Sequence, residues 1–85
     1  MAKYTARVQD AVTLGRMLQQ ARNLRGLSQR QLAEELGLTQ KAVYAMESGE
    51  PTKYAHRLFT MMRATGMSML VELTSFDDDA DAIHG

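Results

Sequence analysis

Two short amphipathic segments separated by three residues constrain the fold of this chain most. Both lie in the stretch SQRQLAEELGLTQKAVYAMESG, residues 28–49. Ser28 and Gln31 have the spacing of a helix capping box, and Gly37 is a typical helix stop. The apolar face of this first segment consists of Leu32, Ala33 and Leu36. The pattern therefore predicts a short helix that ends at Gly37.

The second segment follows at once. Thr39 is a suitable N-cap, Val43 and Met46 form the predicted inner face, and Gly49 ends the helix. Two short helices joined by a tight, glycine-containing turn make a helix-turn-helix unit.

Longer predicted helices flank this unit. One runs from a cap at Thr13 to a stop at Gly26, and another from a cap at Thr52 to Gly66. Their apolar faces are Leu14, Met17, Leu18 and Ala21 in the first, and Ala55, Leu58, Phe59 and Met62 in the second. The first dozen residues either fray or add a turn to the first of these helices.

The period changes from helical to two after Gly66. Met67, Met69, Val71 and Leu73 alternate with other residues, which predicts a strand. The fold class is thus an all-α, four- to five-helix helix-turn-helix domain with one C-terminal strand and a disordered acidic tail. The expected divisions are an N-terminal extension (1–12), the DNA-binding domain (13–66), the strand (67–75) and the tail (76–85).

A lone strand would leave a row of backbone groups unpaired. A two-stranded ribbon is marginal in water unless its apolar face packs on helices. We therefore predict that the strand pairs with its copy in a homodimer. The predicted dimer interface consists of Met67, Met69, Val71 and Leu73. Docking within the chain, or a fifth helix in place of the strand, are the alternatives.

A net charge of zero conceals a strong asymmetry. Residues 1–66 contain all ten Lys and Arg residues but five acidic ones, whereas the last 19 residues contain five acids and no Lys or Arg. A basic body suits a nucleic-acid partner, although a solvated surface is the simpler interpretation. The acidic tail either keeps the protein soluble, docks on a basic partner surface, or competes with DNA.

In a helix-turn-helix unit, the start of the second helix meets base edges in the major groove. Glutamine at position 40 suits adenine, and lysine at position 41 suits guanine or a phosphate. Tyr44, one helical turn further along, either contacts DNA or is partly packed against the protein. The start of the first helix favours an anion, which makes Gln29 a phosphate candidate. The predicted DNA-contacting residues are Gln29, Thr39, Gln40, Lys41, Tyr44 and Lys53.

Arg22 and Glu47 form a second predicted constellation. Arg22 lies next to the apolar face of the first helix, and Glu47 lies on the inner side of the recognition helix. A bidentate pair would join these helices and leave no lone buried charge. The alternative is two independent surface charges.

Other chemistry finds no support in the sequence. There is no cysteine, His56 and His84 are not at metal-ligand spacing, and Asp77–Asp79 lacks the pattern of a calcium loop. We expect no enzyme activity, no metal and no cofactor. No apolar run approaches the roughly 18 residues of a membrane span. The expected location is the cytoplasm, with nucleoid association when the protein is bound to its operator.

The stretch from Leu27 to Gly49 resembles the Xre/Cro family of phage-type repressors, which implies a lambda-repressor-like fold. The shared features are Arg22, Leu27-Ser28-Gln29, Leu32-Ala33, Leu36-Gly37, Val43, Met46, Glu47 and Gly49. The resemblance implies DNA contacts at positions 29, 40, 41 and 44 and an ion pair between Arg22 and Glu47. The chain departs from many relatives at Ala45, Ser48 and Glu50, which argues against binding by a lone monomer.

Over residues 12–85 the chain resembles HipB-type antitoxins. That resemblance implies a dimer on a palindromic operator, repression of its own operon, and neutralisation of a HipA-type serine/threonine kinase toxin. A stand-alone phage-type repressor or restriction-modification controller is the alternative, and a protein-interaction module without DNA binding is a third. The sequence does not define the operator or its half-site spacing.

Overall fold

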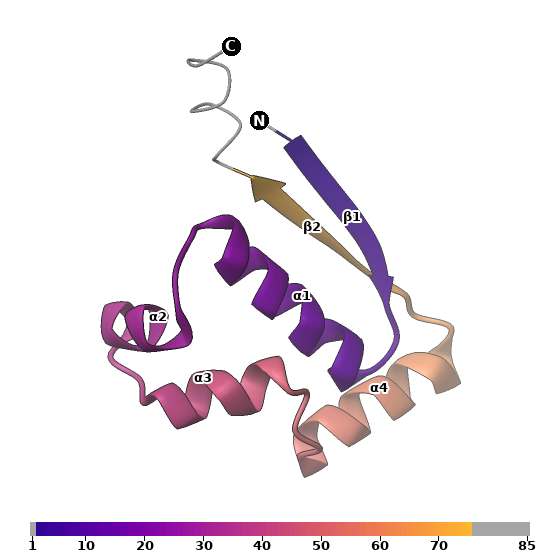
Figure 1. The fold of residues 1–85 in the computed structure, drawn as a ribbon. Helices are drawn as coiled ribbons and strands as arrows, with labels where there is room; N and C mark the ends of the chain where they lie inside the picture. Colours follow the sequence, from indigo (N-terminus) through magenta and orange to yellow (C-terminus); the bar gives the residue numbers. More distant parts are fainter. Residues whose placement is uncertain (1, 76–85) are drawn as a thin grey trace.

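The computed structural model describes residues 2–75 (Figure 1). The predicted acidic tail, residues 76–85, lies outside the described residues. In chain order the elements are β1 (Ala2–Val8), α1 (Ala11–Leu24), α2 (Gln29–Leu36), α3 (Gln40–Glu47), α4 (Lys53–Thr65) and β2 (Met69–Ser75).

Helices α2 and α3 confirm the predicted helix-turn-helix unit. Ser28 Oγ accepts the Gln31 amide at 3.0 Å, and Gln31 Oε1 accepts the Ser28 amide at 2.8 Å, so both halves of the capping box are present. Gly37 ends α2 with a φ of 69°, a left-handed conformation that glycine adopts without steric cost. Thr39 Oγ1 then accepts the Ala42 amide at 3.0 Å and caps α3.

Helix α1 begins three residues earlier than predicted. Asp10, not Thr13, is its N-cap: Asp10 Oδ1 accepts the Thr13 amide at 2.7 Å. This hydrogen bond is the main reason that the pKa of Asp10 lies below its ordinary value. A carboxylate at this position also interacts favourably with the positive end of the helix dipole, which explains why Asp10 starts the helix.

The N-terminal segment is a strand rather than a fraying extension. β1 pairs antiparallel with β2, in a register that runs from Ala2 opposite Ser75 to Val8 opposite Met69. Tyr4, Ala6 and Val8 alternate with polar residues, which is the signal that a helix-centred interpretation misses. The chain is therefore not all-α with a lone strand, since its two ends form a two-stranded sheet.

The sheet lies on one side of α1, and α3 and α4 lie on the other (Figure 1). Val8, Phe59 and Met62 form the buried cluster between these layers. The partly buried residues packed around it are Ala11, Leu14, Met17, Leu58, Met69 and Val71. A ribbon of two strands thus obtains the helical support that it needs from within the same chain.

Three residues of the predicted apolar faces are exposed, and one of them is Leu18 of α1, which keeps 41% of its accessible surface. Met46 and Leu36 each keep 57% of their accessible surface. In α3 the inner positions belong to Val43 and Glu47, and this rotation turns Met46 outward. Leu36 is the last residue of α2, where the chain leaves through Gly37, and only Ala33 of that helix is buried.

Candidate nucleic-acid interface

Helix α3 has a fixed inner side and a free outer side. Val43 and Glu47 are buried at 4% and 8% exposure, one turn apart. Gln40, Lys41 and Tyr44 are all exposed. Because residues one turn apart share a face, the buried pair sets the rotation of the helix and leaves these three polar side chains available to a ligand.

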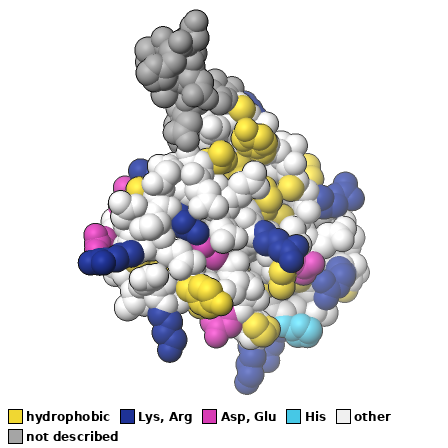
Figure 2. Space-filling view, in the orientation of Figure 1, with side chains coloured by type: hydrophobic (Ala, Val, Ile, Leu, Met, Phe, Trp, Pro, Cys, Tyr) yellow, Lys and Arg dark blue, Asp and Glu magenta, His cyan; other side chains and the backbone are white. Residues whose placement is uncertain are grey.

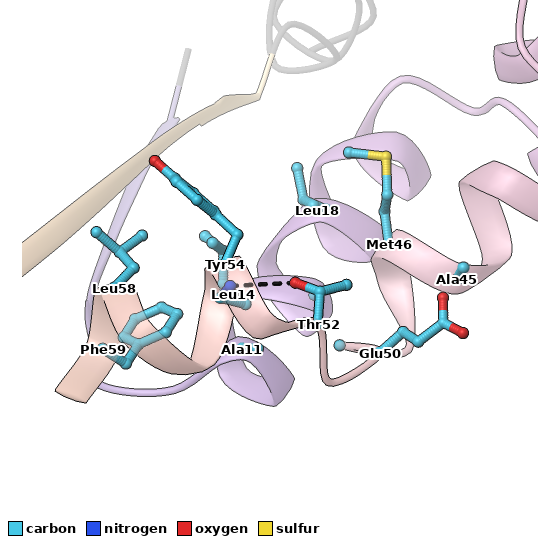
Figure 3. A pocket seen from close by; sticks show the side chains of 13 residues that line it. Ala11, Leu14, Leu18, Ala45, Met46, Glu50, Thr52, Tyr54, Leu58 and Phe59 are labelled. Carbon is cyan, nitrogen blue, oxygen red and sulfur yellow. Dashed lines mark hydrogen bonds between the residues drawn. The ribbon is translucent and has the colours of Figure 1, made fainter.

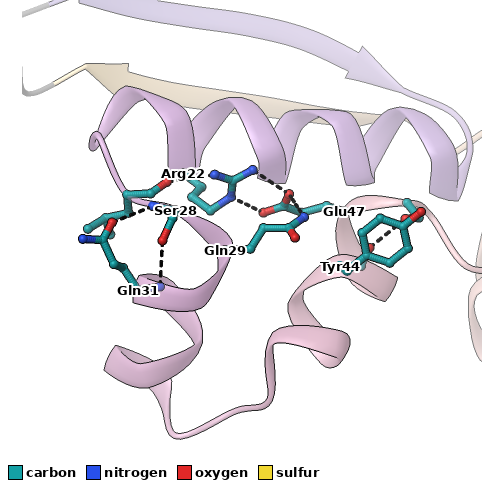
Figure 4. Close-up of polar contacts among 8 residues, drawn as sticks. Arg22, Ser28, Gln29, Gln31, Tyr44 and Glu47 are labelled. Atoms are coloured by element: carbon teal, nitrogen blue, oxygen red, sulfur yellow. Dashed lines mark hydrogen bonds and ion pairs between the residues drawn. The ribbon is translucent and has the colours of Figure 1, made fainter.

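An ion pair holds α3 in this rotation (Figure 4). Arg22 Nε donates to Glu47 Oε2 at 2.6 Å, and Arg22 Nη2 donates to Glu47 Oε1 at 3.0 Å. The remaining Arg22 nitrogen, Nη1, donates to the Leu27 carbonyl at 2.8 Å. The two side chains are only 9% and 5% exposed. Arg22 therefore connects α1, the α1–α2 turn and the end of α3.

Gln29 belongs to the same network. Its Nε2 donates to Glu47 Oε1 at 3.1 Å, so its side chain joins the start of α2 to the end of α3 (Figure 4). The sequence-based expectation placed Gln29 against a DNA phosphate. In this structure its side-chain amide turns towards Glu47. The backbone amides of Gln29 and Arg30, in the first turn of α2, have no intrahelical acceptor and remain for an anion.

The network favours the charged form of both Glu47 and Arg22. The hydrogen bonds from Arg22 lower the pKa of Glu47, and the bond from Gln29 adds to this effect against the opposing effect of burial. The hydrogen bonds to Glu47 raise the pKa of Arg22. The pair is thus held in its charged form, which suits a structural connection rather than proton transfer.

Sequence reasoning missed residues of α1 that border the same surface. Arg16 and Gln19 line a shallow depression between α1 and α3 together with Gln29, Tyr44 and Ser48. Ser48 Oγ donates to the Tyr44 carbonyl at 2.7 Å and so is tied to the helix end. The sequence does contain a signal for these two residues, because Arg16 and Gln19 lie one turn apart on the polar side of α1.

The last predicted DNA contact, Lys53, is the first residue of α4 and is exposed. Thr52 caps that helix by accepting the Ala55 amide at 3.1 Å. In Figure 2, Lys and Arg side chains project along the lower edge of the molecule, where Figure 1 places α3 and the start of α4. This arrangement offers several cations to one extended polyanion.

The four predicted dimer-interface residues do not share one exposed face. Met69 and Val71 pack against the core, and Leu73 is half-buried. Met67 precedes β2 and is exposed. On the opposite face of the sheet, Leu70 keeps 73% of its surface, which makes it the most exposed aliphatic side chain of β2.

The part of the chain that the structure describes contains no group of three or more His, Cys, Asp or Glu residues arranged to hold a metal ion. None of its helices combines the length and the apolar character that a membrane span requires.

Comparison with known proteins gives one result that bears on this surface. A family model described as helix-turn-helix matches residues 18–71, well over half of the chain. The matched range contains α2, α3 and α4 and ends within β2. No curated protein and no solved structure matches the chain significantly.

Proposed function

Because the chain belongs to the Xre/Cro-type helix-turn-helix family of DNA-binding transcription regulators, we propose that it is a dimeric repressor of its own operon and the antitoxin of a toxin–antitoxin pair. The proposed toxin is a HipA-type serine/threonine kinase. The observation that supports specific DNA binding best is the orientation of α3. Its inner residues are fixed by packing and by the Arg22–Glu47 pair, and its outer residues are exposed.

In the proposed complex, α3 enters the major groove with Gln40 and Lys41 towards base edges. Tyr44 lies one turn further along the same outer surface. Thr39, Lys53 and the first-turn amides of α2 contact phosphates on either side of the groove. Arg16 is a further phosphate contact at the edge of the depression that it shares with Tyr44.

A dimer is proposed because one copy presents only a short recognition helix. β1 satisfies one edge of β2, and in the described chain no element pairs with the other edge. Pairing of two such edges would form a four-stranded sheet, with the exposed Leu70 of each copy on its outer face. Two recognition helices about one DNA turn apart would then bind a palindromic operator.

The antitoxin role rests on the organisation of the C-terminal part. Helix α4 ends at Thr65 and is capped by Gly66, whose φ is 76°, and β2 begins at Met69. An acidic segment follows in the sequence. This order of recognition helix, final helix, strand and acidic end is the one that resembles HipB-type antitoxins.

The first experiment is fluorescence anisotropy of the purified protein on DNA from upstream of its own gene. It would use two salt concentrations and an excess of nonspecific competitor DNA. We expect saturable binding by two subunits per site that survives the competitor and weakens steeply with salt. Binding that the competitor removes would contradict specific autorepression.

A separate experiment tests the toxin. The chain would be co-expressed with a kinase encoded beside its gene, and the complex would be isolated by a tag on the kinase. We expect co-purification and loss of kinase toxicity. Specific operator binding without any such partner would instead support a stand-alone repressor or a restriction-modification controller.

A further inference from the structure

A basic concavity lies at the end of the molecule away from α2 and the start of α3. It occupies about 260 Å³ between the end of β1, the end of α4 and the turn into β2. Its polar lining includes Arg7, Gln9, Arg63 and Ser68. Figure 1 shows these three segments meeting beside the start of α1.

The two guanidinium groups are not neutralised within residues 2–75. Four other basic residues form ion pairs with carboxylates: Lys3, Arg22, Arg25 and Arg30. Among the described residues, no carboxylate pairs with Arg7 or Arg63. Asp10 is near enough for Arg63 to lower its pKa, but its carboxylate is engaged by the Thr13 amide. The concavity therefore carries uncompensated positive charge.

Arg63 is held at the rim of the concavity by neutral acceptors. Its Nη1 donates to the Gln9 carbonyl at 3.3 Å, and its Nη2 donates to Thr60 Oγ1 at 3.4 Å. Both bonds are long, and neither partner is charged, so the guanidinium remains attractive to a carboxylate.

This concavity is separate from the proposed DNA surface. Lys53 and Arg63 stand at opposite ends of α4, and a helix rise of about 1.5 Å per residue puts them roughly 15 Å apart along the axis. An anion at Arg63 would therefore bind at a different position from the phosphate contacts proposed beside α3. The sequence itself contains a candidate of the right charge.

Residues 77–81 include four aspartates and begin two positions after the end of β2 at Ser75. In its own chain Ser75 lies opposite Ala2, at the far end of the sheet from Val8 and Met69. Six residues of strand span roughly 20 Å. An acidic segment would have to return along the whole strand to reach Arg7 of the same chain.

A second copy removes that difficulty. The inference rests on the dimer proposed above, in which two β2 strands pair antiparallel around a two-fold axis. Such an axis places the end of one strand beside the beginning of the other. Met69, at the beginning of β2, lies opposite Val8, next to the basic concavity. The acidic segment of one copy would thus enter beside Arg7 and Arg63 of the other.

We propose that residues 77–81 of each copy dock on Arg7 and Arg63 of the second copy and so latch the dimer. Two such contacts form per dimer by symmetry. The latch explains why the two parts of the chain have opposite charges. The acidic segment of one copy neutralises the basic concavity of the other across the interface. It also leaves the basic residues around α3 free for DNA.

An exchange experiment tests the latch in trans. One chain would carry Arg7→Gln and Arg63→Gln with its acidic segment intact. The other would keep both arginines and carry Asp77→Asn, Asp78→Asn, Asp79→Asn and Asp81→Asn. Neither homodimer can form a latch, whereas the mixed dimer can form one. Native mass spectrometry at low salt would measure the proportions after mixing.

We expect the squared concentration of the mixed dimer, divided by the product of the two homodimer concentrations, to exceed its statistical value by about tenfold, since several partly exposed ion pairs each add a modest factor. High salt should return the mixture to statistical proportions. As a matched control, Lys53→Gln with Arg57→Gln removes two charges from α4 outside the concavity, and this chain should mix statistically with the aspartate variant.

Sedimentation of the wild-type chain separates the possible failures. A wild-type dimer whose variants mix statistically at low salt would overturn the latch and leave the proposed repressor dimer intact. A wild-type monomer at all accessible concentrations would overturn the dimer and the latch together. Equal enrichment with the Lys53 and Arg57 control would also overturn the latch, because it would reduce the effect to net charge.

Discussion

Gly15 of α1 and Gly49, just after α3, bring two backbones into direct contact. A methyl group at Gly15 would lie 2.8 Å from the Gly49 nitrogen and 2.5 Å from the Glu47 carbonyl oxygen. Real Cβ atoms do not approach other atoms so closely. The absence of both side chains therefore sets how near the recognition helix lies to α1.

The first prediction compares two glycines of equal φ. Gly49 and Gly37 both have a φ of 69°, but a Cβ at Gly49 would lie 2.5 Å from Val12 Cα, whereas one at Gly37 meets nothing within 4 Å. Alanine at either position costs about 1–2 kcal/mol for the left-handed conformation. Overpacking should add about 1–3 kcal/mol to Gly49→Ala alone. Urea unfolding of both variants measures the difference, and equal losses would contradict the close contact.

The second prediction concerns the ion pair that fixes α3. Arg22→Ala leaves the Glu47 carboxylate buried without its partner, so we expect a loss of about 3 kcal/mol in the free energy of unfolding. The matched control is Arg30→Ala, which breaks an exposed pair with Glu34 and should cost about 0.3–0.5 kcal/mol. Chemical denaturation of both variants measures the two losses in the free energy of unfolding. Similar small losses would mean that the pair contributes little to stability.

The third prediction is a loss of stability in acid. The pKa of Glu47 lies below its ordinary value of 4.5 in the folded protein, because Arg22 and Gln29 donate to the carboxylate. The unfolded chain then binds more protons than the folded chain below about pH 4.5. The contribution of Glu47 is present above this pH and disappears as pH falls through the folded pKa. Urea unfolding along a pH series should show a shallower acid decline for Glu47→Gln than for the wild type.

A shallower decline in Glu47→Gln, rather than its complete absence, is the expected outcome. Asp10 also has a lowered pKa in the folded state and contributes with the same sign. An acid decline that is identical in the wild type and in Glu47→Gln would contradict the shift assigned to Glu47.

The helix-turn-helix unit was predictable because its signals are local. Ser28 and Thr39 cap their helices through residues three positions away, and Gly37 ends α2 by its own conformation. The connection between Arg22 and Glu47 followed from helical periodicity combined with charge. Each of these features depends on a few neighbouring residues, or on two helix faces that the pattern defines.

The errors concern features that only the tertiary structure determines. β1 has a strand signal in its alternation, but the segment is short, and its pairing partner β2 lies at the other end of the described chain. Met46 is exposed because Glu47 occupies the inner position of α3. Periodicity alone does not show which of these two neighbouring residues is buried. The hydrogen bond from Gln29 to Glu47 likewise depends on how α2 and α3 meet, and the phosphate contact expected of Gln29 stays a prediction.

The fourth prediction tests the recognition face. Gln40→Ala with Lys41→Ala should abolish specific operator binding, since each lost base contact costs about 1–3 kcal/mol, while the fold remains intact. Both side chains are exposed. Lys3→Ala on β1 is the charge-matched control and should keep specificity. Anisotropy titrations with circular dichroism as a folding check provide the measurement, and retained operator specificity in the double variant would place recognition elsewhere.

The fifth prediction tests dimerisation through the free edge of β2. Leu70 keeps 73% of its surface and lies outside the core, so Leu70→Lys should leave the monomer folded. A lysine on an edge strand opposes pairing with a second copy, because its charge would lie at the new interface. We therefore expect monomers by sedimentation and at least tenfold weaker operator binding, as both half-sites must be held together. Leu36→Lys, also at an exposed leucine but on α2, should remain dimeric, and an unchanged dimer in Leu70→Lys would exclude this edge from the interface.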